Sequence, residues 1–199
     1  MKPLVVILAG GEGSRMGGGK PLRMLRGDTL IARALRLARC WSDDVRVAVR
    51  AADQVPKLEA PLLLDDPEVW GPLAGLASAL SAARESGRTH VLTIPCDMPF
   101  LPADLFDRLH AEMGASAVAM AMSGDDLCPV CALWSVEVLD PLKSYRAAGR
   151  RSLKGLAETV GCAYVPWPED AFVNVNTPED LAAAERRLAS EVQDLDAGS

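Results

Sequence analysis

Long apolar runs are missing from this 199-residue sequence, and positive charge is scarce. No run approaches the roughly 20 consecutive apolar residues that an α-helix needs to cross a bilayer, so we expect no membrane association. Lys and Arg number 21 against 27 Asp and Glu, which gives a formal net charge of −6 at pH 7. Because nucleic-acid binding rewards a basic face through counterion release, nucleic acid is not expected as the main partner. A small anionic substrate stays open, because a phosphate site needs only a few local donors.

Cysteine and histidine are also few. The five cysteines are odd in number and unevenly spread, which indicates a reducing compartment and hence a cytoplasmic location. Cys128 and Cys131 form a lone CxxC, but a structural zinc site usually needs four ligands and no second pair accompanies them. We therefore expect neither metal nor redox function there. His90 and His110 are expected to be structural.

Nearly half of the residues are apolar, at 49%, which is enough for one substantial core. We expect a single domain over residues 1–189 and a flexible tail over 190–199. Continuous or alternating apolar runs predict strands over residues 4–8, 45–49, 62–64, 90–94, 115–122 and 130–134. Helical patterns are expected over 30–38, over 72–83, after Pro102 and after Thr177, the last with Thr as cap.

This alternation of strands and helices predicts an α/β fold, a Rossmann-like three-layer sandwich with a mostly parallel sheet. Ligands bind such sheets beyond the carboxyl ends of the strands. Two unusual segments, the glycine-rich stretch 10–20 and the PCDMP turn 95–99, each follow a predicted strand. Both are therefore expected to open onto the same edge of the sheet.

The glycine-rich stretch places six glycines among eleven residues and also contains Arg15 and Lys20. Glycines let backbone N–H groups converge on an anion, and positive side chains neutralise phosphates. A Rossmann fingerprint would need glycine where Met16 stands, and a Walker A loop would need glycine at Ser14. A flexible linker is the alternative, but the position between a buried strand and a helix favours phosphate binding.

The stretch instead matches the signature of nucleotidyltransferases that bind an NTP and release pyrophosphate. Four segments stand in a common order: 8–20 (LAGGEGSRMGGGK), 71–75 (GPLAG), 95–99 (PCDMP) and 172–178 (FVNVNTP). Together they resemble the molybdenum cofactor guanylyltransferase family. The resemblance implies a fold like that of the nucleotide-diphospho-sugar transferases and a Mg²⁺-dependent transfer of GMP from GTP to the phosphate of molybdenum-molybdopterin cofactor.

The same resemblance implies roles for the first segment and for Asp97. Backbone groups of Leu8, Ala9, Gly10 and Gly11 would hold the nucleoside, and Lys20 would contact its phosphates. Arg15 is a second phosphate candidate, because its planar fork suits paired oxygens. Asp97 lies between two prolines and would be the Mg²⁺ ligand, an oxygen donor of the kind that ion prefers. The expected catalytic residues are Lys20, Asp97 and Arg15.

Asp65 or Asp66 corresponds to the nucleotide-binding aspartate of the family. A carboxylate suits guanine, whose N1–H and N2–H₂ groups are donors, and Asp65 is favoured because it directly follows a predicted strand. Arg50 stands where the family often has Asn. It could stack on the base or bond the ribose, or the contact could be lost.

The pterin side is assigned to two later segments. Asn174 and Asn176 alternate along an extended segment, so both point to one face, and the family places them near the metal and the pterin. Gly149-Arg150-Arg151-Ser152 is a basic turn in which Arg151 could bind the pterin; the alternative is an exposed loop with solvated arginines.

GTP and molybdopterin cofactor are thus the expected substrates, with transient contacts to proteins that deliver or receive the cofactor. One rival is a cytidylyltransferase acting on the same pterin or another small-molecule NTP transferase. The pterin cytidylyltransferase typically reads Ala-Ala-Gly where this chain has Ala9-Gly10-Gly11, and it lacks GPLAG. A nucleotide-sensing module without turnover is another rival, but the presence of Lys20 and Asp97 disfavours it.

Overall fold

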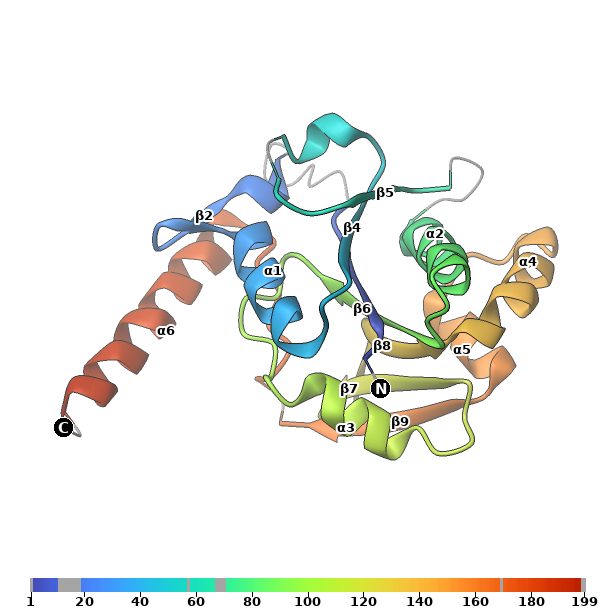
Figure 1. Ribbon diagram of the computed structural model, residues 1–199. Helices are drawn as coiled ribbons and strands as arrows, with labels where there is room; N and C mark the ends of the chain where they lie inside the picture. The colour runs from blue at the N-terminus through green and yellow to red at the C-terminus, as the bar shows by residue number, and fades with distance from the viewer. Residues whose placement is uncertain (1, 11–18, 57, 67–70, 169, 198–199) are drawn as a thin grey trace.

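The computed structural model describes residues 2–10, 19–56, 58–66, 71–168 and 170–197, with side chains described up to residue 190. Its described strands include a seven-stranded sheet in the order β5-β4-β1-β6-β8-β7-β9 (Figure 1). Neighbouring strands are parallel except at β8, which runs antiparallel to β6 and β7. The strands are β1 (Leu4–Leu8), β4 (Val45–Val49), β5 (Leu62–Leu64), β6 (His90–Pro95), β7 (Val118–Ser123), β8 (Asp126–Ser135) and β9 (Cys162–Trp167).

Helices cover both faces of this sheet, which confirms the predicted three-layer α/β fold. The helices α1 (Leu30–Trp41) and α3 (Leu105–Glu112) pack on one face. The other face is covered by α2 (Pro72–Glu85), α4 (Leu139–Ala147) and α5 (Leu153–Val160) (Figure 1). No helix in the described part of the chain combines the length and the apolar character needed to span a membrane.

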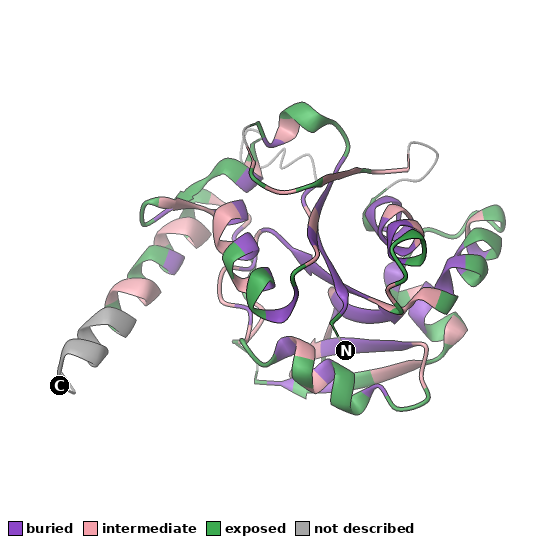
Figure 2. Ribbon diagram, in the orientation of Figure 1, coloured by how far each residue is buried: buried purple, intermediate pink, exposed green. Residues whose placement is uncertain are grey.

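The alternation of side chains along β1 divides the core in two. Val5 and Ile7 belong to the cluster under α1 and α3, whereas Leu4 and Val6 belong to the cluster under α2, α4 and α5. All four side chains are fully buried, as expected for a strand covered on both faces (Figure 2). The first strand is therefore the common wall of two packed layers.

A smaller unit lies beside the α1 layer. It consists of the hairpin β2 (Met24–Leu25) and β3 (Asp28–Thr29) and the last helix, α6 (Pro178–Ala197), which share a separate apolar cluster. Thr177 Oγ1 accepts from the Asp180 amide at 3.1 Å, while Asp180 Oδ2 accepts from the Thr177 amide at 2.9 Å. This reciprocal cap agrees with the helix start expected after Thr177. The predicted flexible tail begins within α6, and its flexibility stays a prediction.

Some elements differ from the expectation. The helix expected after Pro102 begins at Leu105, because residues 102–105 first form a turn in which the Leu105 amide donates to the Pro102 carbonyl at 3.1 Å. The strand expected at 130–134 is longer and carries a register shift against β7 near Met120. The described residues also form short 3₁₀ helices at Lys20–Leu22, Ala52–Gln54 and Val136–Val138.

Candidate active site

A cleft of about 520 Å³ opens at the carboxyl ends of the parallel strands. Segments that follow four neighbouring strands line it: Leu8–Gly10 after β1, Arg50 after β4, Asp65 after β5 and Pro95–Met98 at the end of β6. The rim also includes Lys20, Asn174 and Asn176. The glycine-rich stretch, through its described residues, and the PCDMP turn thus share one edge, as the strand order requires.

One end of the cleft, the Asp65 end, consists of Gly10, Arg50, Asp65 and Gly75. The Asp65 amide donates to the Val49 carbonyl at 2.8 Å, which continues the pairing of β4 with β5 and fixes the backbone of the aspartate. A Cβ atom built on Gly10 would lie 2.4 Å from Asp65 Oδ2, and one built on Gly75 would lie 3.3 Å from Oδ1. The carboxyl group therefore lies between two glycines that leave room for it.

The Asp65 carboxyl group has an unused acceptor. Its Oδ1 atom is buried and accepts no hydrogen bond from any described residue. Burial raises the pKa of Asp65, and the positive charge of Arg50 acts in the opposite direction. Since a buried acceptor without a partner costs about 1–3 kcal/mol, a ligand that brings a donor to this atom would regain that free energy.

Asp66 lies outside the cleft. Its carboxylate forms an ion pair with Arg146 of α4 at 2.6 Å, and it does not line the cleft wall. The two neighbouring aspartates thus have different surroundings, and Asp65 is the one placed to contact a bound molecule.

The other end, the Asp97 end, consists of Lys20, Asp97, Asn174 and Asn176. Lys20 Nζ donates to the Asp97 carboxylate and to the Asn176 side-chain oxygen. The Val175 amide donates to the Asp97 carbonyl at 2.8 Å. Segments that are 77 and 156 residues away from Lys20 are thereby joined at one point.

Asp180 holds the asparagine segment in place, a role that was not inferred from the sequence. Its Oδ2 atom accepts from the backbone amides of Asn176 and Thr177, both at 2.9 Å. These hydrogen bonds, that of Asn176 first, lower the pKa of Asp180. The Thr-Pro-Glu-Asp pattern predicts a helix cap, but only the structure shows that the same carboxylate positions Asn176.

The donor atoms at the Asp97 end suit a magnesium ion. Asp97 offers a carboxylate, and Asn174 and Asn176 offer amide oxygens nearby on the same wall. Among the described residues, no group of three or more His, Cys, Asp and Glu side chains is placed to hold a metal. One carboxylate, with further positions for water and phosphate oxygens, is a common arrangement for Mg²⁺ in nucleotide sites.

Arg151 is not brought to the cleft, and two other expected residues are not described. Gly11 and Arg15 lie outside the described residues. Arg151 is exposed between α4 and α5 and does not line the cleft, while its neighbour Arg150 lies over the Tyr145 ring at 5.5 Å. The basic turn is therefore separate from the residues that form the cleft wall.

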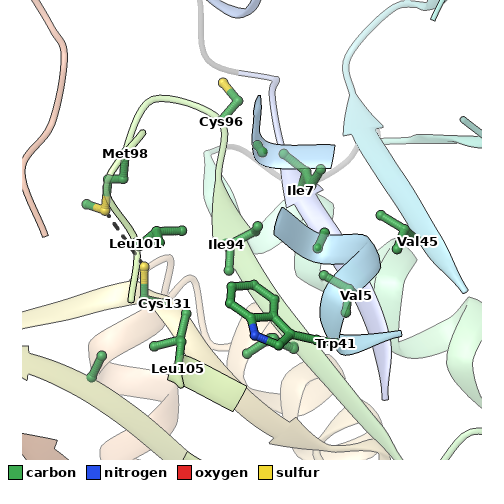
Figure 3. Close-up of a cluster of buried hydrophobic side chains, with 14 of the residues drawn as sticks. Val5, Ile7, Trp41, Val45, Ile94, Cys96, Met98, Leu101, Leu105 and Cys131 are labelled. Carbon is green, nitrogen blue, oxygen red and sulfur yellow. Dashed lines mark hydrogen bonds between the residues drawn. The ribbon is translucent and has the colours of Figure 1, made fainter. Parts of the chain in front are cut away.

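The CxxC cysteines pack beneath the PCDMP turn. Both cysteines are buried. The sulfur atom of Cys131 lies 3.7 Å from Met98 Sδ (Figure 3), and that of Cys128 lies 3.9 Å from it. Burial raises the pKa of Cys131 well above its usual range and that of Cys96 to about 12. A hydrogen bond with Cys131 lowers the pKa of Cys128. Both CxxC cysteines contact Met98 and, through it, pack against the turn that carries Asp97.

Comparisons with known proteins agree with this architecture. Residues 5–163 match the family model described as the MobA-like NTP transferase domain. A molybdenum cofactor guanylyltransferase of Cereibacter sphaeroides is 37% identical over 195 residues, which cover 96% of this chain and all of that protein. One from Rhodobacter capsulatus is 39% identical over 190 residues, covering 92% of this chain and 95% of that protein.

Solved structures give the same fold. Molybdopterin-guanine dinucleotide biosynthesis protein A from Archaeoglobus fulgidus superposes with a TM-score of 0.78 at 25% identity, covering 96% of this chain and all of that one. The 2-C-methyl-D-erythritol 4-phosphate cytidylyltransferase from Thermus thermophilus has a TM-score of 0.72 at 21% identity, covering 95% of this chain and all of that one. The second likeness shows the fold alone.

Proposed function

The chain belongs to the MobA-like NTP transferase family, and from this premise we propose that it is a guanylyltransferase. It transfers GMP from GTP to the phosphate of molybdenum-molybdopterin cofactor, which yields the guanine dinucleotide form of the cofactor and pyrophosphate. The observation that carries the choice of nucleotide is the contact between Gly10 and the Asp65 carboxyl group.

The position of the Asp65 carboxyl group depends on glycine at position 10. An alanine at position 10, as in the Ala-Ala-Gly pattern typical of the pterin cytidylyltransferases, would place its Cβ 2.4 Å from Asp65 Oδ2 and force the carboxyl group to move. With glycine there, the carboxyl group can stay in the cleft and accept hydrogen bonds from N1–H and N2–H₂ of guanine. Cytosine has no pair of adjacent donors, so this arrangement favours GTP over CTP.

The two ends of the cleft define the direction of the nucleotide. The guanine base lies at the Asp65 end, and the triphosphate lies at the Asp97 end, where Lys20 supplies positive charge. The backbone of Leu8, Ala9 and Gly10 lines the same cleft, which supports its proposed contact with the nucleoside. By the family resemblance, Gly11 would join this contact and Arg15 would act on the phosphates.

The reaction needs positioning and charge neutralisation more than a general base. The phosphate of the pterin is already an anion, and it attacks the α-phosphorus in line as pyrophosphate leaves. Asp97, with Asn174 and Asn176 beside it, would hold Mg²⁺, which would neutralise the phosphate charge when bound. Lys20 neutralises the departing oxygens, and the hydrogen bonds from Lys20 and to Asp180 hold these groups in position before substrate arrives.

Arg151 is proposed to act on the pterin side, together with Asn174 and Asn176. The basic turn is exposed and separate from the nucleotide cleft, which suits a second, larger substrate that enters from outside. Proteins that deliver or receive the cofactor would make transient contacts with this side. A cytoplasmic location fits this work, because all five cysteines are free thiols.

The direct test is to incubate the purified protein with Mg²⁺, molybdopterin cofactor and each nucleoside triphosphate in turn, and to identify the nucleotide product by mass spectrometry. We expect the guanine dinucleotide from GTP, release of pyrophosphate, and loss of both products when Mg²⁺ is chelated. Equal turnover with CTP would refute the guanylyl assignment.

A further inference from the structure

Arg50 and Asp65 occupy equivalent places on neighbouring strands. Val49 of β4 is paired with Leu64 of β5 in a parallel register, so Arg50 and Asp65 are the next residues beyond this pair. Arg50 is held where it leaves the strand, because its amide and that of Ala51 donate to Gln54 Oε1 at 2.7 and 3.2 Å. The two charged residues therefore emerge side by side at the edge of the sheet.

Both side chains also face the same point above Gly10. A Cβ atom built on this glycine would lie 2.4 Å from Asp65 Oδ2 and 3.4 Å from Arg50 Cγ. Both residues line the cleft, where Asp65 is half-buried and Arg50 is exposed. A ligand at this end of the cleft thus meets a carboxylate acceptor next to the donors of a guanidinium group.

Guanine has the complementary pattern on two adjacent edges. N1–H and N2–H₂ are donors that match a carboxylate, while O6 and N7 are acceptors that match the guanidinium fork, the commonest specific pairing of arginine with a base. Adenine and cytosine lack this combination of two donors beside two acceptors. An asparagine at position 50, as the related family often has, offers only one amide group in place of the fork.

We propose that Arg50 is a specificity-determining residue that donates to O6 and N7 of guanine, while Asp65 accepts from N1–H and N2–H₂. This inference rests on the proposed function, because it assigns the two edges of the base that the function requires.

The test measures binding of Mg²⁺-nucleotides in the absence of the pterin, with GTP, 7-deaza-GTP and ITP as probes. In 7-deaza-GTP a C–H group replaces N7, and ITP lacks the N2 amino group. For the unaltered protein we expect each analogue to bind roughly tenfold more weakly than GTP, since each loses a hydrogen bond to a charged group. In Arg50→Asn the penalty for 7-deaza-GTP disappears and that for ITP remains. In Asp65→Asn the reverse holds.

Two further variants serve as controls. One keeps the positive charge at position 50, and the other removes an arginine outside the cleft. Arg50→Lys keeps the positive charge and can still donate to N7, so we expect it to keep part of the 7-deaza penalty that Arg50→Asn loses. Arg36→Asn removes an exposed arginine that is paired with Asp28 outside the cleft, and all nucleotide affinities should stay unchanged. Circular dichroism of each variant confirms that the fold is retained.

The outcomes separate the two proposals. If the unaltered protein binds GTP no better than CTP, the guanylyl assignment fails whatever Arg50 does. If it prefers GTP but Arg50→Asn keeps the full 7-deaza penalty, the guanylyl assignment survives and the contact of Arg50 with N7 is refuted. A ribose or stacking contact would then be the role of Arg50, because neither depends on N7.

Discussion

The two ends of the cleft differ in how far the protein itself satisfies their polar groups. At the Asp97 end, the Asp97 carboxylate and the Asn176 oxygen both accept from Lys20, and the Asp97 carbonyl accepts from the Val175 amide. At the Asp65 end, a buried carboxylate oxygen has no donor among the described residues. The protein itself satisfies these polar groups at the Asp97 end, whereas at the Asp65 end it leaves one acceptor without a partner among the described residues.

This difference matches the chemistry proposed for each end. Phosphate transfer gains from groups that are fixed before substrate arrives, because no reorganisation is then needed as charge develops. Base recognition gains from an acceptor that only the correct base can satisfy, because a wrong base leaves the desolvated oxygen unpaired. Under the proposed function, the Asp97 end is the catalytic end of the cleft and the Asp65 end is the recognition end.

The largest effect is expected from Asp97→Asn, which removes the metal ligand from the Asp97 end. We expect kcat to fall roughly 10²-fold or more if the metal supplies several kcal/mol of charge stabilisation, while the fold is retained. Activity and direct Mn²⁺ binding by electron paramagnetic resonance measure the effect. Asp107→Asn on the exposed surface of α3 is the control; wild-type Mn²⁺ affinity in Asp97→Asn would contradict the assignment.

A change outside both ends tests whether a third site exists. Arg151→Ala should leave Mg²⁺-GTP affinity nearly intact and weaken pterin binding by roughly 1.5–3 kcal/mol, the value of a hydrogen bond to a charged group. Separate titrations with Mg²⁺-GTP and with the pterin measure both affinities. Arg150→Ala is a matched control, because Arg150 lies over the Tyr145 ring. Equal weakening of GTP and pterin would place Arg151 with the triphosphate instead.

Gly10→Ala should change the Asp65 end of the cleft and leave the Asp97 end as it is. The added Cβ displaces the Asp65 carboxyl group, so we expect the preference for GTP over CTP to fall by roughly 1–3 kcal/mol, the value of one bidentate base contact. CTP affinity should change little, and it serves as the internal control in the same binding titration. Unchanged selectivity would show that Asp65 does not read the base.

Stability should show the cost of the unsatisfied acceptor. Because burial raises the pKa of Asp65 in the folded state, the native state binds the proton more tightly than the unfolded chain, and ionised Asp65 lowers stability at neutral pH. Asp65→Asn should then raise the free energy of unfolding by about 1 kcal/mol at neutral pH. The gain should shrink as pH falls through the raised pKa. Urea denaturation at several pH values measures it, and a gain that is independent of pH would contradict this explanation.

The smallest effect is expected from the thiols beneath the Asp97 end. Cys128 and Cys131 contact Met98 and are not placed to hold a metal, so the double Cys→Ser variant should fold and turn over with little change. Steady-state activity and zinc content by elemental analysis are the measurements. Stoichiometric zinc in the unaltered protein, lost together with activity in the variant, would overturn this interpretation.

The elements that position the recognition end could be predicted from the sequence. The first strands, 4–8, 45–49 and 62–64, have the expected bounds, because continuous apolar runs next to glycine or charged residues leave little choice of boundary. The rule that parallel strands present their carboxyl ends to one ligand cleft predicted that the glycine-rich stretch and the PCDMP turn share one edge, whereas Arg50 and Asp65 were assigned to the nucleotide site by the family resemblance.

The later half of the chain was harder to predict for physical reasons. Helices α4 and α5 have nine and eight residues, too few to give a clear helical period. Strand β9 pairs only with β7 at the sheet edge and is partly exposed, so it lacks a continuous apolar run. The ion pair of Asp66 with Arg146 spans 80 residues, and no local pattern predicts such a partner.

The hydrogen bond between Lys20 and Asn176 has a consequence for biosynthesis. The ribosome makes these residues 156 positions apart, and nascent domains form from the N-terminal side first. All residues of the Asp65 end have been synthesised once α2 has emerged. The Asp97 end also needs Asn174 and Asn176, which are made later and lie in the segment that Asp180 holds in place. A nascent chain that stops before this segment lacks the hydrogen bond that Lys20 donates to Asn176. Under the proposed function, Mg²⁺-GTP that contacts both ends should therefore stabilise the finished chain more than a chain that stops before this segment.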